Sequence, residues 1–175
     1  MMKTYLEIQV PLRSDASWFE ELRSVCHCLP VRWQAGFFHI TLAFADETPE
    51  DINLYQVLDK HFGTLDAQTL VFDQLDAFTT NSGMHIVYLT VSQVPQSFLS
   101  VIECVRSDMK NAGCVIESDF RLHVTLGRIK DSRIELATVK SYVESVSIQP
   151  FSLLLDHVDY RVFRGEILYE TILNT

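Results

Sequence analysis

The chain has 175 residues, of which 47% are hydrophobic, so we expect one globular domain or two small lobes sharing a cleft, and exclude a disordered chain. Its formal net charge of −9 and its lack of a Lys/Arg cluster exclude duplex nucleic acid as an expected partner, because cations supply most of that affinity. No apolar run reaches the roughly 20 residues that span a bilayer, and residues 1–11 include Glu7 and lack the uncharged core of a signal peptide. We therefore expect a cytoplasmic protein with no membrane partner.

The first half of the chain alternates strands and helices. Thr48 followed by Pro49 combines a capping residue with a proline at the first helical position, which predicts the start of a helix. Residues 80–83, Thr-Asn-Ser-Gly, are typical of a hairpin turn. In chain order we expect a strand over 4–10, a helix over 16–29, a strand over 38–45, a helix from Thr48-Pro49 to about Phe62, and a hairpin of 69–78 with 85–91.

The second half repeats this order. We expect a helix over 95–112, a strand over 121–129, a helix over 133–146, and a hairpin of 151–162 with 166–173 around Arg164-Gly165. His39 and His123, on matched strands, lie 84 residues apart. Units this small should pack together to bury their sheet faces. We therefore expect an α+β fold for 1–175 as a single domain of two pseudo-symmetric lobes, with two antiparallel sheets flanked by helices around a central cleft.

Each matched strand carries a motif of the form His-x-Thr-Leu, namely His39-Ile40-Thr41-Leu42 and His123-Val124-Thr125-Leu126. Side chains alternate between the two faces of a strand, so each histidine shares a face with its threonine. The branched aliphatic side chains take the other face and anchor the strand in a core. The polar pairs are therefore free to face the cleft from both lobes.

This set of side chains suits the cleavage of a phosphodiester. One proton must leave the attacking oxygen and another must reach the leaving oxygen, and two histidines can divide these tasks as the catalytic pair His39 and His123. Thr41 and Thr125 can hold the non-bridging oxygens of the phosphate, and Arg128 can stabilise developing charge. Arg128 has the wrong strand parity, so it reaches the cleft only if the chain bulges near Gly127. The scheme needs no metal and no cofactor.

The remaining histidines and the cysteines give weaker signals. We interpret His27 and His61, near helix ends, as surface residues, while His85 and His157 lie on strands that could line the cleft. Tyr160 and Arg161 follow His157 and are candidates for substrate binding. Cys26-His27-Cys28 lacks the paired ligand spacings of zinc sites, so we expect reduced, mostly packed thiols at the four cysteines, which are Cys26, Cys28, Cys104 and Cys114.

The paired motifs, extended to His39-Ile40-Thr41-Leu42-Ala43-Phe44 and His123-Val124-Thr125-Leu126-Gly127-Arg128, resemble those of the 2H phosphoesterase superfamily. The branch that they resemble most is the bacterial 2′-5′ RNA ligase and RNA 2′,3′-cyclic phosphodiesterase family. This resemblance implies a bilobal α+β fold, a catalytic pair of His39 and His123, and phosphate binding by Thr41, Thr125 and Arg128. It also implies opening of 2′,3′-cyclic phosphates to 2′-phosphates.

We therefore expect a metal-independent cyclic phosphodiesterase, a monomer that acts on a small nucleotide or a short RNA end. Two alternatives stay open at this point: a phosphodiesterase or ligase for 2′-5′ linked oligonucleotides, and a nucleotide-binding module without turnover. A Cys/His metal protein is a third, and it predicts bound zinc. The sequence does not distinguish which histidine is the base in hydrolysis.

Overall fold

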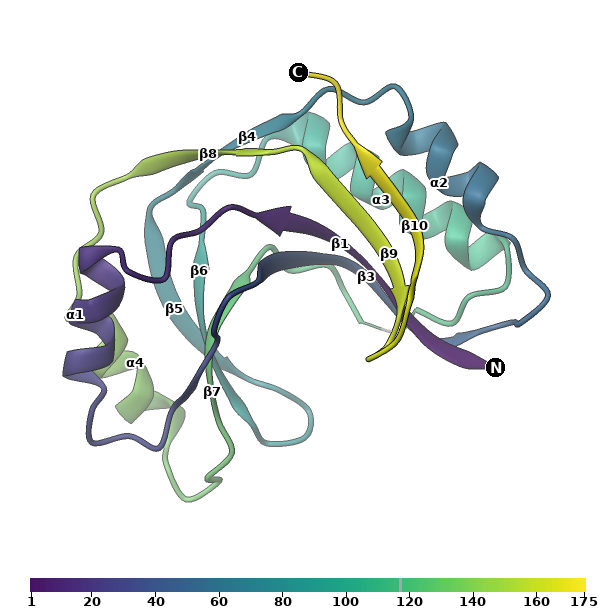
Figure 1. The fold of residues 1–175 in the computed structure, drawn as a ribbon. Coiled ribbons are helices and arrows are strands. Elements are labelled where there is room, and N and C mark those ends of the chain that lie inside the picture. The colour runs from purple at the N-terminus through teal and green to yellow at the C-terminus, as the bar shows by residue number, and fades with distance from the viewer. Residues whose placement is uncertain (117) are drawn as a thin grey trace.

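The computed structural model describes residues 1–116 and 118–175 (Figure 1). In these residues the protein is α+β, as the sequence predicts, with one large and one small antiparallel sheet. The helices found are α1 (Ser17–Val25), α2 (Tyr55–Phe62), α3 (Gln96–Asn111) and α4 (Leu136–Glu144). No helix in this part of the chain is long and apolar enough to cross a membrane.

The large sheet runs in the order β10-β9-β1-β3-β7-β6-β5, with β2 added beside β7, and the small sheet pairs β4 with β8. Both predicted hairpins are confirmed, since β5 pairs with β6 and β9 pairs with β10. The strands are β1 (Met2–Val10), β2 (Arg32–Trp33), β3 (Phe38–Thr48), β4 (Gln68–Phe72), β5 (Gln74–Thr79), β6 (His85–Thr90), β7 (Val124–Ile129), β8 (Phe151–Leu155), β9 (His157–Val162) and β10 (Ile167–Ile172).

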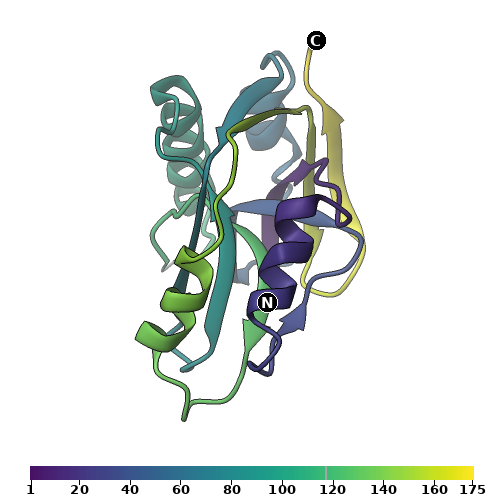
Figure 2. The same cartoon turned by 90° about the vertical axis from the view of Figure 1, so that its left-hand side faces the viewer.

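The two sequence repeats do not form separate halves of the large sheet. The chain order β1-α1-β3-α2-β4-β5 recurs as β6-α3-β7-α4-β8-β9, yet β1 lies between β3 and β9, and β6 lies between β7 and β5. Helix α1 packs with α4 at one end of the molecule, and α2 packs with α3 at the other (Figures 1 and 2). Each half of the large sheet therefore contains strands from both repeats. We keep the division into one domain of two pseudo-symmetric lobes as our interpretation of this topology.

The two halves of the large sheet meet where β3 pairs with β7. The antiparallel pair is Ile40 with Val124, the second residues of the two His-x-Thr-Leu motifs. Both side chains are fully buried. On this register Thr41 lies across from His123, and His39 lies across from Thr125. The predicted meeting of equivalent strands is therefore present, as a joint within one continuous sheet.

The expected start of the second helix at Thr48-Pro49 is wrong. Strand β3 continues through Thr48, whose hydroxyl is buried and shares a hydrogen bond of 2.8 Å with the hydroxyl of Thr4. Thr48 is therefore not available as a helix cap. Helix α2 begins at Tyr55, and the side-chain oxygen of Asn53 accepts a hydrogen bond from the Tyr55 amide at 2.9 Å.

The expected long strands over 69–78 and 151–162 are each divided in two. The first breaks at Asp73, whose carboxylate accepts hydrogen bonds from the amide and hydroxyl of Ser92, and the second breaks at Asp156. The parts before the breaks, β4 and β8, form the small sheet, and the parts after them, β5 and β9, lie in opposite halves of the large sheet. Because of these breaks, each of the two stretches contributes one strand to the small sheet and one to the large sheet.

Candidate functional site

The burial pattern of both motifs follows the predicted alternation. The aliphatic residues Ile40, Leu42, Val124 and Leu126 are each 0% exposed and belong to the core. The candidate residues His39, Thr41, His123 and Thr125 are partly exposed. Strand β7 begins only at Val124, so His123 lies at the entrance of its strand and not within it.

A bulge in each motif changes which face of the sheet the side chains of the following residues point to. Between β6 and β7, Tyr88 pairs with Thr125 and Val87 pairs with Gly127, so the register skips Leu126. The equivalent skip between β1 and β3 falls at Leu42. The bulge that Arg128 requires is therefore present, and it returns this side chain to the face of Thr125.

Both bulged carbonyl groups have hydrogen-bond donors. The Leu42 carbonyl accepts a hydrogen bond from Nη1 of Arg106 at 3.0 Å, and the Leu126 carbonyl accepts one from the backbone amide of Gln34 at 2.7 Å. The Gln34 side chain in turn accepts a hydrogen bond of 2.9 Å from Nη1 of Arg128. The segment around β2 therefore fixes both the second bulge and the arginine that follows it.

His123 has one ring nitrogen committed to the backbone. Its Nδ1 donates a hydrogen bond of 2.9 Å to the carbonyl of Arg121, which leaves Nε2 as the nitrogen available for proton transfer. The rings of Phe78 and Tyr88 contact the imidazole edge to face. Burial lowers the pKa of His123, and the charges of Arg121 and Arg128 also lower it, while the bond to the Arg121 carbonyl opposes them.

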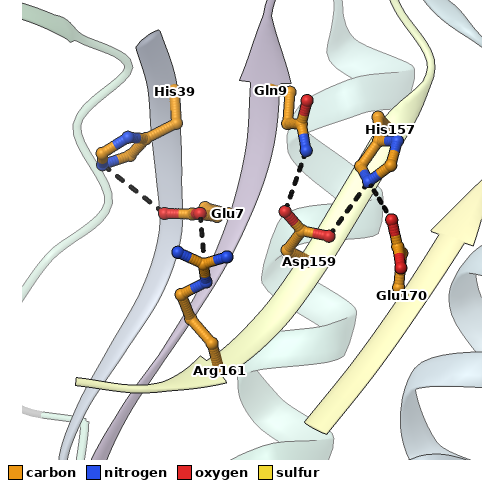
Figure 3. Close-up of polar contacts among 7 residues, drawn as sticks. All are labelled: Glu7, Gln9, His39, His157, Asp159, Arg161 and Glu170. Carbon is orange, nitrogen blue, oxygen red and sulfur yellow. Dashed lines mark hydrogen bonds and ion pairs between the residues drawn. The ribbon is translucent and has the colours of Figure 1, made fainter. Parts of the chain in front are cut away.

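His39 lies beside a buried carboxylate instead. Its Nε2 is 3.6 Å from Oε2 of Glu7 on the neighbouring strand β1, and its Nδ1 is buried without a hydrogen-bond partner among the described residues (Figure 3). Burial first, and then the charges of Arg128, His123 and Arg161, lower the pKa of His39 to about 4. The influence of His123 and Arg128 on His39 indicates that the two motifs and the arginine share one electrostatic environment.

Glu7 is part of a row of polar side chains that crosses β1, β9 and β10 (Figure 3). Its Oε1 lies 3.7 Å from Nε of Arg161. Further along the row, Oδ2 of Asp159 accepts a hydrogen bond from Gln9, and His157 contacts Asp159 at 3.1 Å and Glu170 at 2.8 Å. The nitrogen and oxygen atoms of His157, Asp159 and Glu170 that could bind a metal ion lie within 4.8 Å of one another, but the contacts of His157 with the two carboxyl groups account for this convergence.

Two cavities adjoin these residues. One, of about 720 Å³, is lined by both Thr41 and His123, together with Phe44, Phe78 and Arg121. The other, of about 920 Å³, contains Arg128. Its remaining charged lining residues are Arg32, Lys130 and Arg164, and no Asp or Glu of the described chain lines it. Although the net charge of the protein is −9, positively charged side chains are therefore concentrated beside the candidate site. We call this second cavity the cation-lined cavity.

Two other candidates from the sequence, His85 and Tyr160, are buried and held by hydrogen bonds. His85 is buried, where it accepts a hydrogen bond from the Thr79 hydroxyl and donates one to the Ile134 carbonyl. Tyr160 is buried and donates to the hydroxyl of Thr4. Cys26 and Cys114 are buried, Cys28 and Cys104 are exposed, and all four are free thiols.

A model of the 2′-5′ RNA ligase superfamily matches residues 11–165. The chain belongs to this superfamily. Membership in this superfamily supports an enzyme of the phosphoesterase and ligase type. A search of curated proteins finds no match to the chain.

Solved structures similar to this superfamily member support the fold alone, because their sequence identities are low. E. coli LigT complexed with 3′-AMP is 20% identical over 99% of both chains, with a TM-score of 0.64. A phosphoesterase is 18% identical over the full length of both chains, with a TM-score of 0.62. Kluyveromyces marxianus Usb1 with uridine monophosphate is 13% identical over 98% of both chains, also with a TM-score of 0.62.

Sequence reasoning missed the proximity of Glu7 to His39. The only signal available was one acidic residue between Leu6 and Ile8 in a strand whose other central residues are apolar. That pattern does not reveal a neighbour on another strand. The contact with His39 depends on the pairing of β1 with β3, which places Glu7 opposite Thr41 and Gln9 opposite His39.

Proposed function

We propose that this superfamily member hydrolyses 2′,3′-cyclic phosphates of nucleotides or short RNA ends, leaving 2′-phosphates. The observation that carries the proposal is the pairing of Ile40 with Val124, since it joins two His-x-Thr motifs in antiparallel register. Each histidine then lies beside the other motif's threonine. Two imidazoles and two hydroxyl groups around one point match the requirements of in-line attack on a phosphodiester.

The proposed reaction needs only groups already described. One histidine accepts a proton from water as the water oxygen forms a bond to phosphorus. The other histidine donates a proton to the ribose 3′-oxygen as its bond to phosphorus breaks. Thr41 and Thr125 donate hydrogen bonds to the non-bridging oxygens, and Arg128 offsets the charge that builds on them.

The charges around the histidines support an anionic substrate. The pKa values of His39 and His123 are both lowered, in part by nearby arginines. A bound phosphate would oppose those arginine charges and favour protonation of the histidine that serves as the acid. The cation-lined cavity around Arg128 favours substrates that carry a further phosphate group, as a phosphorylated nucleotide or a short RNA end does.

The test is a turnover screen in EDTA over 2′,3′-cyclic nucleotides, short RNAs with cyclic ends, and 2′-5′ dinucleotides, with products identified by ³¹P NMR. We expect hydrolysis of the cyclic substrates to 2′-phosphates. Turnover of 2′-5′ dinucleotides alone would favour the phosphodiesterase or ligase alternative. Nucleotide binding without any turnover would favour a binding module, and a requirement for added Mg²⁺ or Mn²⁺ would contradict the mechanism.

A further inference from the structure

Among residues 1–116 and 118–175, a carboxylate is buried beside only one of the two candidate histidines. Glu7 is 0% exposed, and neither of its oxygens has a hydrogen-bond partner among the described residues. Burying an unsatisfied carboxylate is costly, and an aliphatic side chain such as those of Leu6 and Ile8 would avoid that cost. The fold therefore gives no reason for an acid at this position, whereas a functional site does.

The contacts of Glu7 connect it with His39. Its Oε2 lies 3.6 Å from Nε2 of His39 on β3, and its Oε1 lies 3.7 Å from Nε of Arg161 on β9. Asp159, opposite Glu7 on β9, is the other charged group that acts on it. Arg128 and His123 approach His39 from β7. Among these groups, Glu7 is the one whose carboxyl group directly contacts the His39 imidazole.

The equivalent position in the other half carries no acid. Tyr88 of β6 pairs with Thr125 as Glu7 of β1 pairs with Thr41. The nearby charges that act on His123 are those of Arg121 and Arg128, both positive. The two histidines therefore differ in their neighbours although their motifs are alike, and this difference can assign them different roles.

We propose that Glu7 is a positioning residue that holds a proton for His39, so that His39 is the general acid and His123 the general base when a cyclic phosphate is opened. This inference rests on the proposed hydrolytic function. When the phosphate binds, the proton of the pair passes from Glu7 to Nε2 of His39 and then to the leaving 3′-oxygen. Glu7 is left as a carboxylate beside Arg161, and it regains a proton from solvent after the product leaves.

The protonation preferences of the pair agree with this role. Burial, partly opposed by Arg161 and aided by Asp159, raises the pKa of Glu7 to about 7. The pair therefore still carries a proton near neutral pH, where an isolated imidazole with the lowered pKa of His39 would not. Exchange across 3.6 Å needs only a small movement of either side chain.

The first experiment follows the His39 ring nitrogens by ¹⁵N NMR in the intact protein, with the signal assigned through His39→Gln. In Glu7→Gln we expect the step near pH 7 to disappear from the His39 signals and only the step at lower pH to remain, because the group that takes up a proton near pH 7 is lost. Glu170→Gln is the control, since it removes a carboxylate of the same row that contacts His157 and acts on neither Glu7 nor His39. An unchanged His39 titration in folded Glu7→Gln would overturn the inference.

The wild-type protein supplies a second measurement in case Glu7→Gln does not fold. The ¹³C carboxyl signal of Glu7 and the His39 ring signals should titrate as a coupled pair with two shared steps. Independent single-step titrations would contradict proton sharing.

The pH–rate profile then separates a positioning role from a structural one. In Glu7→Gln the alkaline limb of kcat/KM should move to lower pH, and Glu7→Asp, which keeps a carboxyl group that can hold the proton, should reverse part of that movement. A lower rate with an unmoved limb would mean a structural role. If wild type opens no cyclic phosphate while the NMR coupling is present, the proposed function fails and the Glu7–His39 pair stands; turnover without coupling gives the reverse result.

Discussion

Oε2 of Glu7 and Nε2 of His39 lie 3.6 Å apart on adjacent strands, and burial moves the pKa values of the two groups in opposite directions. The pKa of Glu7 rises from 4.5 to about 7, so its contribution to stability is present below pH 4.5 and is lost as the pH rises to about 7. The pKa of His39 falls from 6.5 to about 4, so its contribution is present above pH 6.5 and is lost as the pH falls to about 4.

These opposite dependences predict how stability responds to pH in variants. Between pH 4.5 and 6.5 the folded and unfolded pair each hold one proton, so the pair contributes no slope to the free energy of unfolding. Relative to wild type, Glu7→Gln should lose stability as the pH is lowered through this range, with a slope of up to ~1.4 kcal/mol per pH unit. His39→Gln should instead lose stability as the pH is raised.

Urea unfolding of wild type, both single variants and the double variant at several pH values measures these slopes. Differences from wild type remove the contributions of the other titrating groups, and the double variant should be as flat as wild type. If the free energy of unfolding has the same pH dependence in wild type and in Glu7→Gln, the pKa of Glu7 is not raised in the folded protein.

The kinetic contribution of each histidine is a second prediction. His39→Ala and His123→Ala should each lower kcat for a cyclic phosphate by about 10²- to 10⁴-fold, because each removes one proton-transfer partner. Both side chains are partly exposed, so the variants should fold. The double variant should fall far short of the product of the two losses, since both residues act on one transition state.

Thr41→Ala and Thr125→Ala provide the comparison in the same assay, and each should cost less than either histidine substitution, because water can replace a neutral donor. Steady-state kinetics in EDTA measures all five variants. A folded double histidine variant with the wild-type rate would refute the assignment of both residues.

The sequence predicts local features of this fold better than pairings between distant strands. The turn at 80–83, the reversal at Arg164-Gly165 and the burial alternation of both motifs depend on neighbours in the chain, and all are present. The helix start at Thr48 failed because the hydroxyl of Thr4, far away in the sequence, engages that residue. The contact of Glu7 with His39 was missed for the same reason, since strand register is set by packing of the whole sheet.

The bulge that directs Arg128 to the site depends on a close approach that only glycine allows, which gives a third prediction. A Cβ atom at Gly127 would lie 2.5 Å from Cγ1 of Val31 and 2.9 Å from Cε3 of Trp33. Gly127→Ala should therefore destabilise the protein by about 1–3 kcal/mol, as overpacking of a core does. Because β2 would be pushed from β7, kcat/KM should also fall through misplacement of Arg128.

Val31→Ala combined with Gly127→Ala tests the cause, since it removes the atom of closest approach. Thermal unfolding and turnover should both recover in part. A Gly127→Ala protein with wild-type stability and rate would mean that β2 can shift without loss of stability and does not position Arg128.

The cation-lined cavity gives the last prediction. Arg32 and Arg128 are directly opposite each other in the β2–β7 pair, where like charges repel, and their cavity has no acidic residue of the described chain in its lining. A substrate phosphate would relieve this repulsion. We expect a cyclic nucleotide with a 5′-phosphate to have a kcat/KM about 10-fold higher than its unphosphorylated counterpart at low salt, as one charge-assisted contact would give.

Arg32→Gln should reduce this ratio toward one without lowering turnover of the unphosphorylated substrate. Arg133→Gln is the matched control, because Arg133 is exposed, pairs with Asp131 at 2.7 Å and lies outside the cavity lining. The preference should also shrink as salt is raised, since it depends on ionic contacts. An equal preference in wild type and Arg32→Gln would place the second phosphate elsewhere in the cleft.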